Sequence, residues 1–289
     1  MQAASLPAAS AELATIVAFN EGPTCDAEGN VYFTETRSQR IMKLATNGDL
    51  SVFRENSNAA NGLVFDAEFR LIACEGSRSN PRVTRTNLKT GRVEVLASNS
   101  MGLNLTAPND VTFDNKGRIY FTDLPGGAVY RIDGDGRVSR ILARPDIQSP
   151  NGLTIAPDDK TLYLVEANQT QGGARMLRAY DLQPDGSVAN MRVFVNFYPG
   201  RSADGIAIDS QGNVYAAAGL NAPRGTSETL DTKAGAHVFS PAGRRIHYVP
   251  IPEDTITNLC FGGPELKMCY VTAGKSLYKF PVQIAGTRR

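Results

Sequence analysis

The stretch Asn109-Asp-Val-Thr-Phe-Asp114, followed by Gly117-Arg-Ile-Tyr-Phe-Thr-Asp123, decides the fold, because variants of it recur along the whole chain. Each variant has the same parts: an oxygen-bearing residue, a short apolar run, a turn, and a second run that often contains Tyr. Short β-rich runs separated by Asp-Gly, Asn-Gly and Pro are typical of an all-β domain. A unit that recurs with a regular period further favours a repeat architecture such as a propeller.

Six copies of the unit follow one another. Their leading residues are Glu21, Asn61, Asn109, Asn151, Asp204 and Asn258. The intervals between them are 40, 48, 42, 53 and 54 residues, which are typical of propeller blades. A third β-rich run follows in most copies, as in Ala128–Ile132, and a fourth follows a Gly turn, as in Arg137–Leu142. Four strands in each of six units predict an all-β, six-bladed β-propeller without a second domain.

The two ends of the chain indicate how the ring closes. No fourth strand is left for the last blade after Phe280, whereas Leu13–Phe19 forms a spare strand before the first unit. We expect this N-terminal strand to complete the last blade, which leaves no open seam. The predicted organisation is a flexible N-terminus over 1–11, a single propeller over 12–282 and a C-terminal tail over 283–289.

The composition argues against several classes of partner. The chain has 289 residues, of which 42% are hydrophobic and 20% charged, as in globular proteins. The net charge of +1, without long charged runs, argues against a nucleic acid or an anionic membrane. No apolar stretch reaches the roughly 18 residues of a membrane span. We expect a monomer or a weak homo-oligomer. The N-terminus lacks the basic and apolar regions of an intact signal peptide, so the compartment stays open between cytoplasmic and exported.

The sequence lacks the motifs of a disulfide scaffold, a zinc site and a serine hydrolase. Four cysteines in a chain of this length make no disulfide scaffold and lack the spacing of a zinc site, so we expect buried free thiols. There is no Gly-x-Ser-x-Gly elbow. The two histidines, His237 and His247, lie in late strands of the fifth unit, where structural roles are favoured over a catalytic triad.

The leading residues of the six units predict a cation site. The first strand of every propeller blade lines the channel, so these residues are expected to form a ring around its mouth. Carboxylate and amide oxygens suit one hard divalent cation, Ca²⁺ first, with Zn²⁺, Mg²⁺ or Mn²⁺ as alternatives. The competing interpretation is that Asn-Gly and Asp-Gly are ordinary turn dipeptides. Each unit, however, has a separate hairpin turn further on, and Glu21-Gly-Pro keeps the oxygen without the turn preference.

The motifs Glu21-Gly-Pro, Pro108-Asn109-Asp110, Ser149-Pro-Asn151-Gly-Leu and Ala203-Asp204-Gly, each followed by an Asp-containing turn, carry a family resemblance. Over about residues 12–282 the chain resembles the senescence-marker-protein/gluconolactonase (regucalcin-like) family, cousins of diisopropyl fluorophosphatase. The resemblance implies a six-bladed propeller, a divalent ion in the channel, and hydrolysis of lactones or related esters. It implies Glu21, Asn151 and Asp204 as metal ligands, Asn109 as a further ligand or substrate contact, and Asp110 as a pocket residue.

One position departs from the family pattern. Sugar-lactone members carry Arg two residues before the residue that matches Asn109, where it contacts the substrate, and this chain has Ala107 there. Arg78 or Arg82 is a candidate replacement, with a solvated loop residue as the alternative for either. Arg78 and Asn61 therefore join Asn109 and Asp110 as predicted substrate-binding residues.

The predicted mechanism is hydrolysis by water at the ion, with Asp204 and Asn109 as catalytic residues. The ion would polarise the lactone carbonyl, lower the pKa of bound water and stabilise the oxyanion. Asp204 is the candidate to take the proton from the attacking water. The alternatives are a non-catalytic Ca²⁺-binding propeller and the same site acting on an organophosphate or another ester. The long polar segment 219–235 is either a lid over the channel mouth or a surface insertion.

Overall fold

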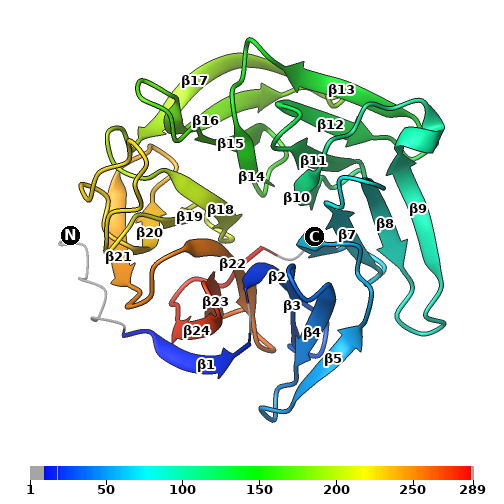
Figure 1. Ribbon diagram of the computed structural model, residues 1–289, viewed down its shortest axis with the longest axis horizontal. Helices are drawn as coiled ribbons and strands as arrows, with labels where there is room; N and C mark the ends of the chain where they lie inside the picture. The colour runs from blue at the N-terminus through cyan, green and yellow to red at the C-terminus, as the bar shows by residue number, and fades with distance from the viewer. Residues whose placement is uncertain (1–9, 18, 288–289) are drawn as a thin grey trace.

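Six antiparallel sheets of four strands each are arranged in a ring, as Figure 1 shows for the computed structural model. The structure describes residues 10–17 and 19–287. Within this part of the chain the only helix is the short 3-10 helix η1 (Asn99–Met101), and no helix is long and apolar enough to cross a membrane. The predicted six-bladed propeller of four-stranded blades is confirmed.

The strands of each blade are given below in order from the innermost, which lines the channel, to the outermost. Blade 1 holds β2 (Asn20–Cys25), β3 (Val31–Glu35), β4 (Arg40–Leu44) and β5 (Leu50–Arg54), and blade 2 holds β6 (Ala60–Phe65), β7 (Leu71–Glu75), β8 (Arg82–Thr86) and β9 (Val93–Ser98). Blade 3 holds β10 (Pro108–Phe113), β11 (Ile119–Asp123), β12 (Ala128–Ile132) and β13 (Val138–Ala143), and blade 4 holds β14 (Pro150–Ile155), β15 (Thr161–Ala167), β16 (Arg175–Leu182) and β17 (Val188–Asn196). Blade 5 holds β18 (Ala203–Ile208), β19 (Val214–Ala218), β20 (Gly235–Phe239) and β21 (Arg245–Pro250), and blade 6 holds β22 (Ile256–Gly262), β23 (Met268–Ala273), β24 (Ser276–Pro281) and β1 (Glu12–Ile16).

The N-terminal strand closes the ring. β1 pairs antiparallel with β24, with Glu12 opposite Lys279 and Ile16 opposite Ser276. The first strand of the chain thereby gives blade 6 its fourth strand, as predicted, and covers an edge that would otherwise expose unpaired backbone groups. Most of the predicted N-terminal segment 1–11 lies outside the described residues.

The Tyr that recurs in the second strand of the repeat packs between blades. Tyr32 makes edge-to-face contacts with Phe53 of its own blade at 5.0 Å and with Phe65 of blade 2 at 5.1 Å. Tyr215 contacts Phe261 across blades 5 and 6 at 4.8 Å. Pairs of this kind contribute about 0.5–1.5 kcal/mol beyond simple burial. The recurring Tyr therefore joins neighbouring blades.

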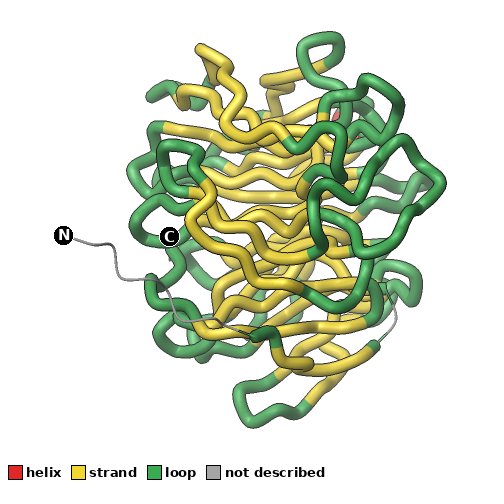
Figure 2. Tube along the Cα trace, turned by 90° about the vertical axis from the view of Figure 1, so that its left-hand side faces the viewer, coloured by secondary structure: helices red, strands yellow, loops and turns green. Residues whose placement is uncertain are grey.

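The innermost strands run between two faces of the ring, seen edge-on in Figure 2. We call the face where they begin the proximal face and the face where they end the distal face. At the distal end, an Asp directly after the strand accepts hydrogen bonds from the turn that follows. These residues are Asp26, Asp66, Asp114 and Asp209. The Asp of the repeated turn is thus a turn former on the distal face.

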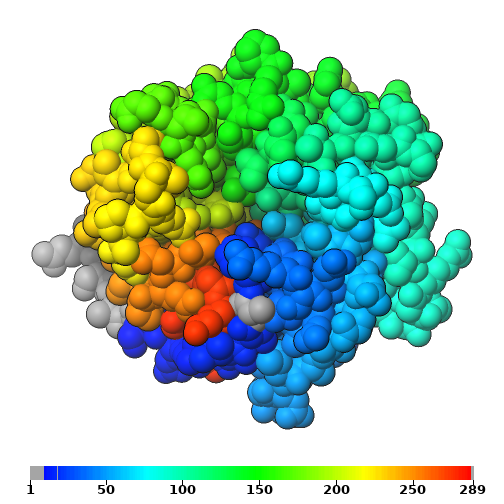
Figure 3. Space-filling view, viewed as in Figure 1, coloured from blue at the N-terminus to red at the C-terminus, as the bar shows by residue number. Residues whose placement is uncertain are grey.

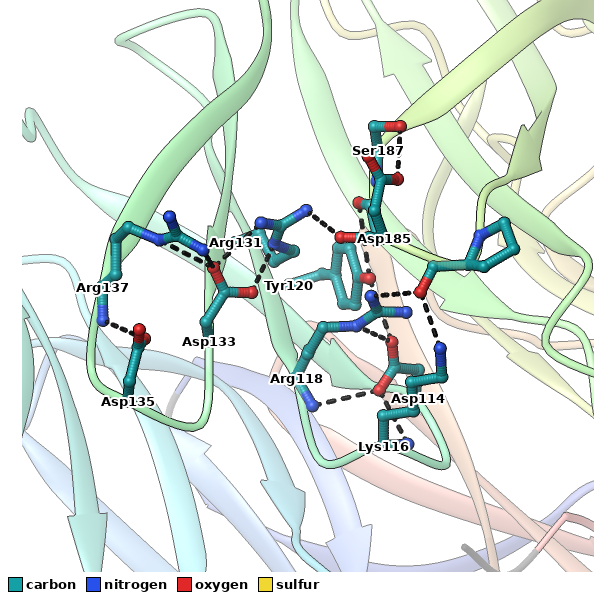
Figure 4. A network of polar contacts seen from close by, with 12 residues as sticks. Asp114, Lys116, Arg118, Tyr120, Arg131, Asp133, Asp135, Arg137, Asp185 and Ser187 are labelled. Atoms are coloured by element: carbon teal, nitrogen blue, oxygen red, sulfur yellow. Dashed lines mark hydrogen bonds and ion pairs between the residues drawn. The ribbon is translucent and has the colours of Figure 1, made fainter.

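Polar contacts on the distal face also tie blade 3 to blade 4 (Figure 4). Tyr120 Oη and Arg118 Nε donate to Asp114 Oδ2 at 3.0 and 2.6 Å. Arg131 Nη1 donates to the carbonyl oxygen of Asp185 in the β16–β17 turn at 2.7 Å. Backbone hydrogen bonds of residues 285–287 reach the same face, as from the N–H of Thr287 to the carbonyl oxygen of Ile208 at 3.2 Å.

Three of the four cysteines are buried, as expected from the sequence, and so is one of the two histidines. Cys74, Cys260 and Cys269 are buried free thiols, and Cys25 is half-buried. His237 is buried, with Nε2 2.8 Å from the carbonyl oxygen of Lys233, and its ring packs against Phe239 and Tyr248.

Candidate metal centre and substrate pocket

The second residue of each innermost strand lies on a ring at the proximal face. Each innermost strand contacts the innermost strands of both neighbouring blades, so the six second residues surround the channel. They are Glu21, Asn61, Asn109, Asn151, Asp204 and Thr257. Five of the six predicted ring positions are therefore where the repeat placed them.

The sixth predicted position, Asn258, is wrong by one residue. β22 begins at Ile256, so Thr257 takes the ring position and Asn258 follows it, as Asp110 follows Asn109. The backbone N–H groups of Asp110 and Asn258 each donate to a Thr hydroxyl of the second strand at 3.0 Å, and each side-chain Oδ1 accepts from the next N–H. Thr257 and Asn258 are both polar, so the sequence of this degenerate copy does not show which of them holds the ring position. The strand register decides between them.

Glycine after the ring residue lets the innermost strands approach one another. A Cβ on Gly152 would lie 2.5 Å from the carbonyl oxygen of Asp204, and one on Gly205 would lie 2.0 Å from Cγ of Asn258. The strand register shifts at this point of each blade, which marks a β-bulge. The Asn-Gly and Asp-Gly pairs thus lie inside strands, and the close approach of the neighbouring innermost strand, rather than a hairpin turn, requires the glycine.

Asp110 and Asn258 meet across the channel from opposite blades. Asn258 Nδ2 donates to Asp110 Oδ2 at 3.1 Å, although 148 residues separate them. Below this crossbar, toward the distal face, a cavity is lined by these two residues and by apolar side chains such as Leu63, Leu153 and Leu259. The crossbar therefore forms the floor beneath the ring.

Three acidic side chains lie close together at the ring and its floor: Glu21 and Asp110 are buried, and Asp204 is half-buried. Burial and the negative charges of Asp204 and Asp110 raise the pKa of Glu21 well above its ordinary value. Burial also raises the pKa of Asp110 to about 7, against hydrogen bonds from Val111 and Asn258. Glu21 is only 7% exposed. These carboxylates repel one another in a poorly solvated place, which favours a compensating positive charge there.

Asp204 is held by two neighbours that differ in kind. Arg201 Nη2 donates to Asp204 Oδ2 at 2.8 Å, and its Nη1 donates to the carbonyl oxygen of Ile256 at 2.8 Å. Burial raises the pKa of Asp204, while the charge of Arg201 and a hydrogen bond from Asn151 oppose that rise. The contact between Asn151 and Asp204 brings two of the predicted ligands together.

Arg201 and a second arginine, Arg224, are residues that the sequence reasoning missed. Arg201 lies three positions before Asp204 and is 5% exposed. Arg224 belongs to the long segment between β19 and β20, and its charge interacts with that of Asp204. The proximity of Arg201 to Asp204 in the chain is the one local signal, since nothing in the sequence places Arg224 near the ring.

Acidic residues at the proximal ends of second strands position the loops that lead to ring residues. Asp123 accepts from the N–H groups of Thr106 and Ala107 at 2.7 and 2.9 Å, just before β10. Glu166 accepts from the N–H groups of Gln148 and Ser149, just before β14. An acid at the end of the second strand is visible in the sequence, but its role as a loop anchor is not.

The remaining predicted residues lie at the same face with different surroundings. Arg78 is exposed in the loop between β7 and β8, whereas Arg82 forms an ion pair with buried Glu75 at 2.6 Å. Asn61 is half-buried, and its carbonyl oxygen accepts from Thr34 Oγ1 at 2.8 Å. Of the two arginines, Arg78 is therefore the more exposed.

The donors at the ring fit a hard divalent cation. Carboxylate and amide oxygens are the ligands that Ca²⁺ takes in proteins, and a dication offsets the mutual repulsion of Glu21, Asp204 and Asp110. Across residues 10–17 and 19–287, no group of three or more His, Cys, Asp or Glu side chains is arranged to hold a metal. A cation here would therefore have to rely on two carboxylates supplemented by amides.

Known proteins share this fold and sequence pattern. Residues 19–275 match the SMP-30/Gluconolactonase/LRE-like region. A gluconolactonase of Zymomonas mobilis is 24% identical over 288 residues, which cover 86% of this chain and 75% of that protein. A gluconolactonase structure from Xanthomonas campestris is 26% identical with a TM-score of 0.80 and covers 96% of this chain and 91% of that one. A calcium-binding protein, regucalcin, from Agrobacterium tumefaciens is 18% identical with a TM-score of 0.78, over 99% and 97% of the two chains, which shows the fold alone.

Proposed function

The chain belongs to the SMP-30/Gluconolactonase/LRE-like family, and from this premise we propose that it is a metal-dependent hydrolase that opens lactones. The observation that carries the proposal is the group formed by Glu21, Asn151 and Asp204. These residues come from three different blades, and their charges and hydrogen bonds act on one another at the mouth of the channel. The gluconolactonases similar to this chain support lactones as the substrate class.

We assign the holding of one divalent cation, Ca²⁺ first, to Glu21, Asn151 and Asp204, with Asn109 as a fourth donor. When bound, such an ion polarises a carbonyl and makes a bound water more acidic. Arg201 orients the carboxylate of Asp204 through its 2.8 Å hydrogen bond to Oδ2. A carboxylate placed there takes a proton from water most effectively when its position is fixed.

The other predicted residues shape the place where the lactone lies. Asp110 is kept in position by its crossbar to Asn258, and Asn109 is half-buried beside it. A purely structural ion has no use for an additional polar group such as Asp110 next to its ligands, so this residue favours an enzyme over a non-catalytic Ca²⁺-binding propeller. We place Asn109 and Asp110 against the substrate, with Asn61 and Arg78 at the edge of the same face.

The test is a substrate panel run on metal-free protein with Ca²⁺, Zn²⁺, Mg²⁺ and Mn²⁺ added back separately. The panel contains sugar, aliphatic and aromatic lactones and one phosphotriester. We expect lactone turnover that requires a dication and is highest with Ca²⁺. Full turnover in excess EDTA would refute the metal mechanism. Turnover of the phosphotriester alone would assign the site to organophosphates, and tight Ca²⁺ binding without any turnover would assign it to a non-catalytic role.

A further inference from the structure

The segment between β19 and β20 brings Arg224 to the proximal face. β18 runs from the proximal to the distal face and β19 returns, so the connection 219–234 lies on the same side as the ring. Figure 3 looks onto this face and shows the segment in yellow on the left, over blade 5.

The segment is held on both sides of Arg224. Before it, Asn221 donates from its backbone N–H to Asp254 Oδ1 at 2.6 Å and from Nδ2 to the carbonyl oxygen of Ile251 at 3.0 Å. After it, the fully buried Arg175 donates from Nη1 to the carbonyl oxygen of Ser227 at 3.1 Å. The same Arg175 atom donates to the carbonyl oxygen of Pro199, just before β18, at 2.7 Å. These contacts fix Arg224 next to the loop that carries Arg201.

Arg224 has bonding capacity that the described part of the chain does not use. Its Nη2 is buried and has no hydrogen-bond partner among the described residues. Burial and then the positive charge of Arg201 lower the pKa of Arg224. Three acids act on the charge of Arg224, and each has another donor: Glu228 accepts from Thr226 Oγ1 at 2.9 Å, Asp254 from the N–H of Asn221, and Asp204 from Arg201. A buried guanidinium N–H without an acceptor is costly, and an anion that binds there relieves that cost.

We propose that Arg224, next to Arg201, binds a carboxylate group of the substrate, so that the protein prefers lactones bearing a free carboxylate over neutral lactones. The inference rests on the proposed lactonase function and specifies its substrate class. An arginine fork suits a planar carboxylate, which it can bind through two parallel hydrogen bonds. In this proposal the positively charged contact to the substrate comes from Arg224 in blade 5. It does not come from blade 3, where Ala107 occupies the position of the family's arginine.

The experiment compares kcat/KM for D-glucaro-1,4-lactone, which carries a carboxylate, with kcat/KM for a neutral aldono-1,4-lactone of the same ring size. The variants are Arg224→Gln, Arg224→Lys and a matched control, Arg244→Gln, which removes an exposed arginine from the distal β20–β21 turn of the same blade. Loss of a charge-assisted hydrogen bond is expected to lower the acidic-to-neutral ratio of kcat/KM about tenfold in R224Q. R224K should recover part of the ratio, and R244Q should keep the wild-type ratio.

Binding of the open-chain diacid and monoacid, measured by calorimetry, separates this inference from the proposed function. If no lactone is hydrolysed but the diacid binds the wild type about tenfold more tightly than R224Q, the anion site stands and the lactonase proposal fails. If lactones are hydrolysed but the wild type shows no preference, or R224Q loses both substrates equally, the lactonase proposal stands and the anion site is overturned. If neither turnover nor Arg224-dependent binding is seen, both are overturned.

Discussion

Asp204 and Asp209 lie at opposite ends of β18 and carry the same side chain in opposite surroundings. Asp209 is fully buried, and its two oxygens accept three hydrogen bonds at 2.8–2.9 Å from Gln211 and Asn213 in the adjacent turn. Asp204 is held by Arg201 and by Asn151 of the neighbouring blade, and it faces another carboxylate, Glu21. A carboxylate has about four acceptor positions. Donors in the adjacent turn fill most of these positions on Asp209, but not on Asp204. The proximal acid therefore keeps capacity for a ligand.

Replacing each acid with alanine gives the largest expected difference between the two ends. Asp204→Ala should lower kcat/KM for a lactone at least about a hundredfold and abolish metal binding, because a metal ligand is lost. Asp209→Ala should instead lower the free energy of unfolding by at least about 2 kcal/mol, because buried donors lose their acceptor. Lactone kinetics and urea unfolding measure the two effects. Equal loss of turnover in two well-folded variants would remove the functional distinction between the ends.

Metal removal sharpens the same comparison through stability. Ca²⁺ at about 100 times its Kd should raise the free energy of unfolding of the wild type by about 2.7 kcal/mol. Asp209→Ala should gain a similar amount, whereas Asp204→Ala should gain nothing. Thermal unfolding with and without EDTA measures the gain. Identical unfolding temperatures of the wild type in Ca²⁺ and in EDTA would argue against a proximal cation.

Glycine substitutions test the close approach of the innermost strands. In Gly205→Ala the new Cβ would lie 2.0 Å from Cγ of Asn258 and push against the crossbar, at an expected cost of about 1–3 kcal/mol in the free energy of unfolding. The control is Gly134→Ala in the distal β12–β13 turn, where the Cβ meets nothing within 4 Å. Urea unfolding of the two variants measures the contrast, and equal stability would show that the ring tolerates wider spacing.

The smallest effect is expected at Thr257, the ring position for which neither metal binding nor substrate binding is proposed. Thr257 Oγ1 donates to the carbonyl oxygen of Asn20 at 2.9 Å, so Thr257→Val should lower the free energy of unfolding by about 1 kcal/mol. Lactone turnover per folded molecule should change far less than in Asn151→Ala, which removes a proposed ligand. Parallel kinetics on the two variants check this. A loss of turnover in T257V as large as in N151A would place Thr257 in the catalytic centre.

Five ring residues were predictable because each opens a local unit that repeats in the sequence. The β-rich runs, the Asp of the distal turns and the Tyr between blades recur with that unit, so comparison of the copies located them. Asn258 was displaced by one residue because its copy has neither a glycine after the ring position nor a carboxylate or amide at that position, so Asn258 was the only Asn or Asp there to match the other copies. The crossbar to Asp110 and the approach of Arg224 to Arg201 join segments far apart in the chain, which no periodic pattern records.

The sequence by itself determined the six-bladed architecture, the closing strand and the ring residues of five of the six innermost strands. These features follow from side-chain alternation and turn chemistry, which act over a few residues and are repeated in every copy. Only the tertiary structure decided which side chains face one another across the channel, since those contacts depend on the register of each bulged strand and on closure of the ring. That closure brings the other acids close to Glu21. It also forms the crossbar and brings the two arginines close to Asp204.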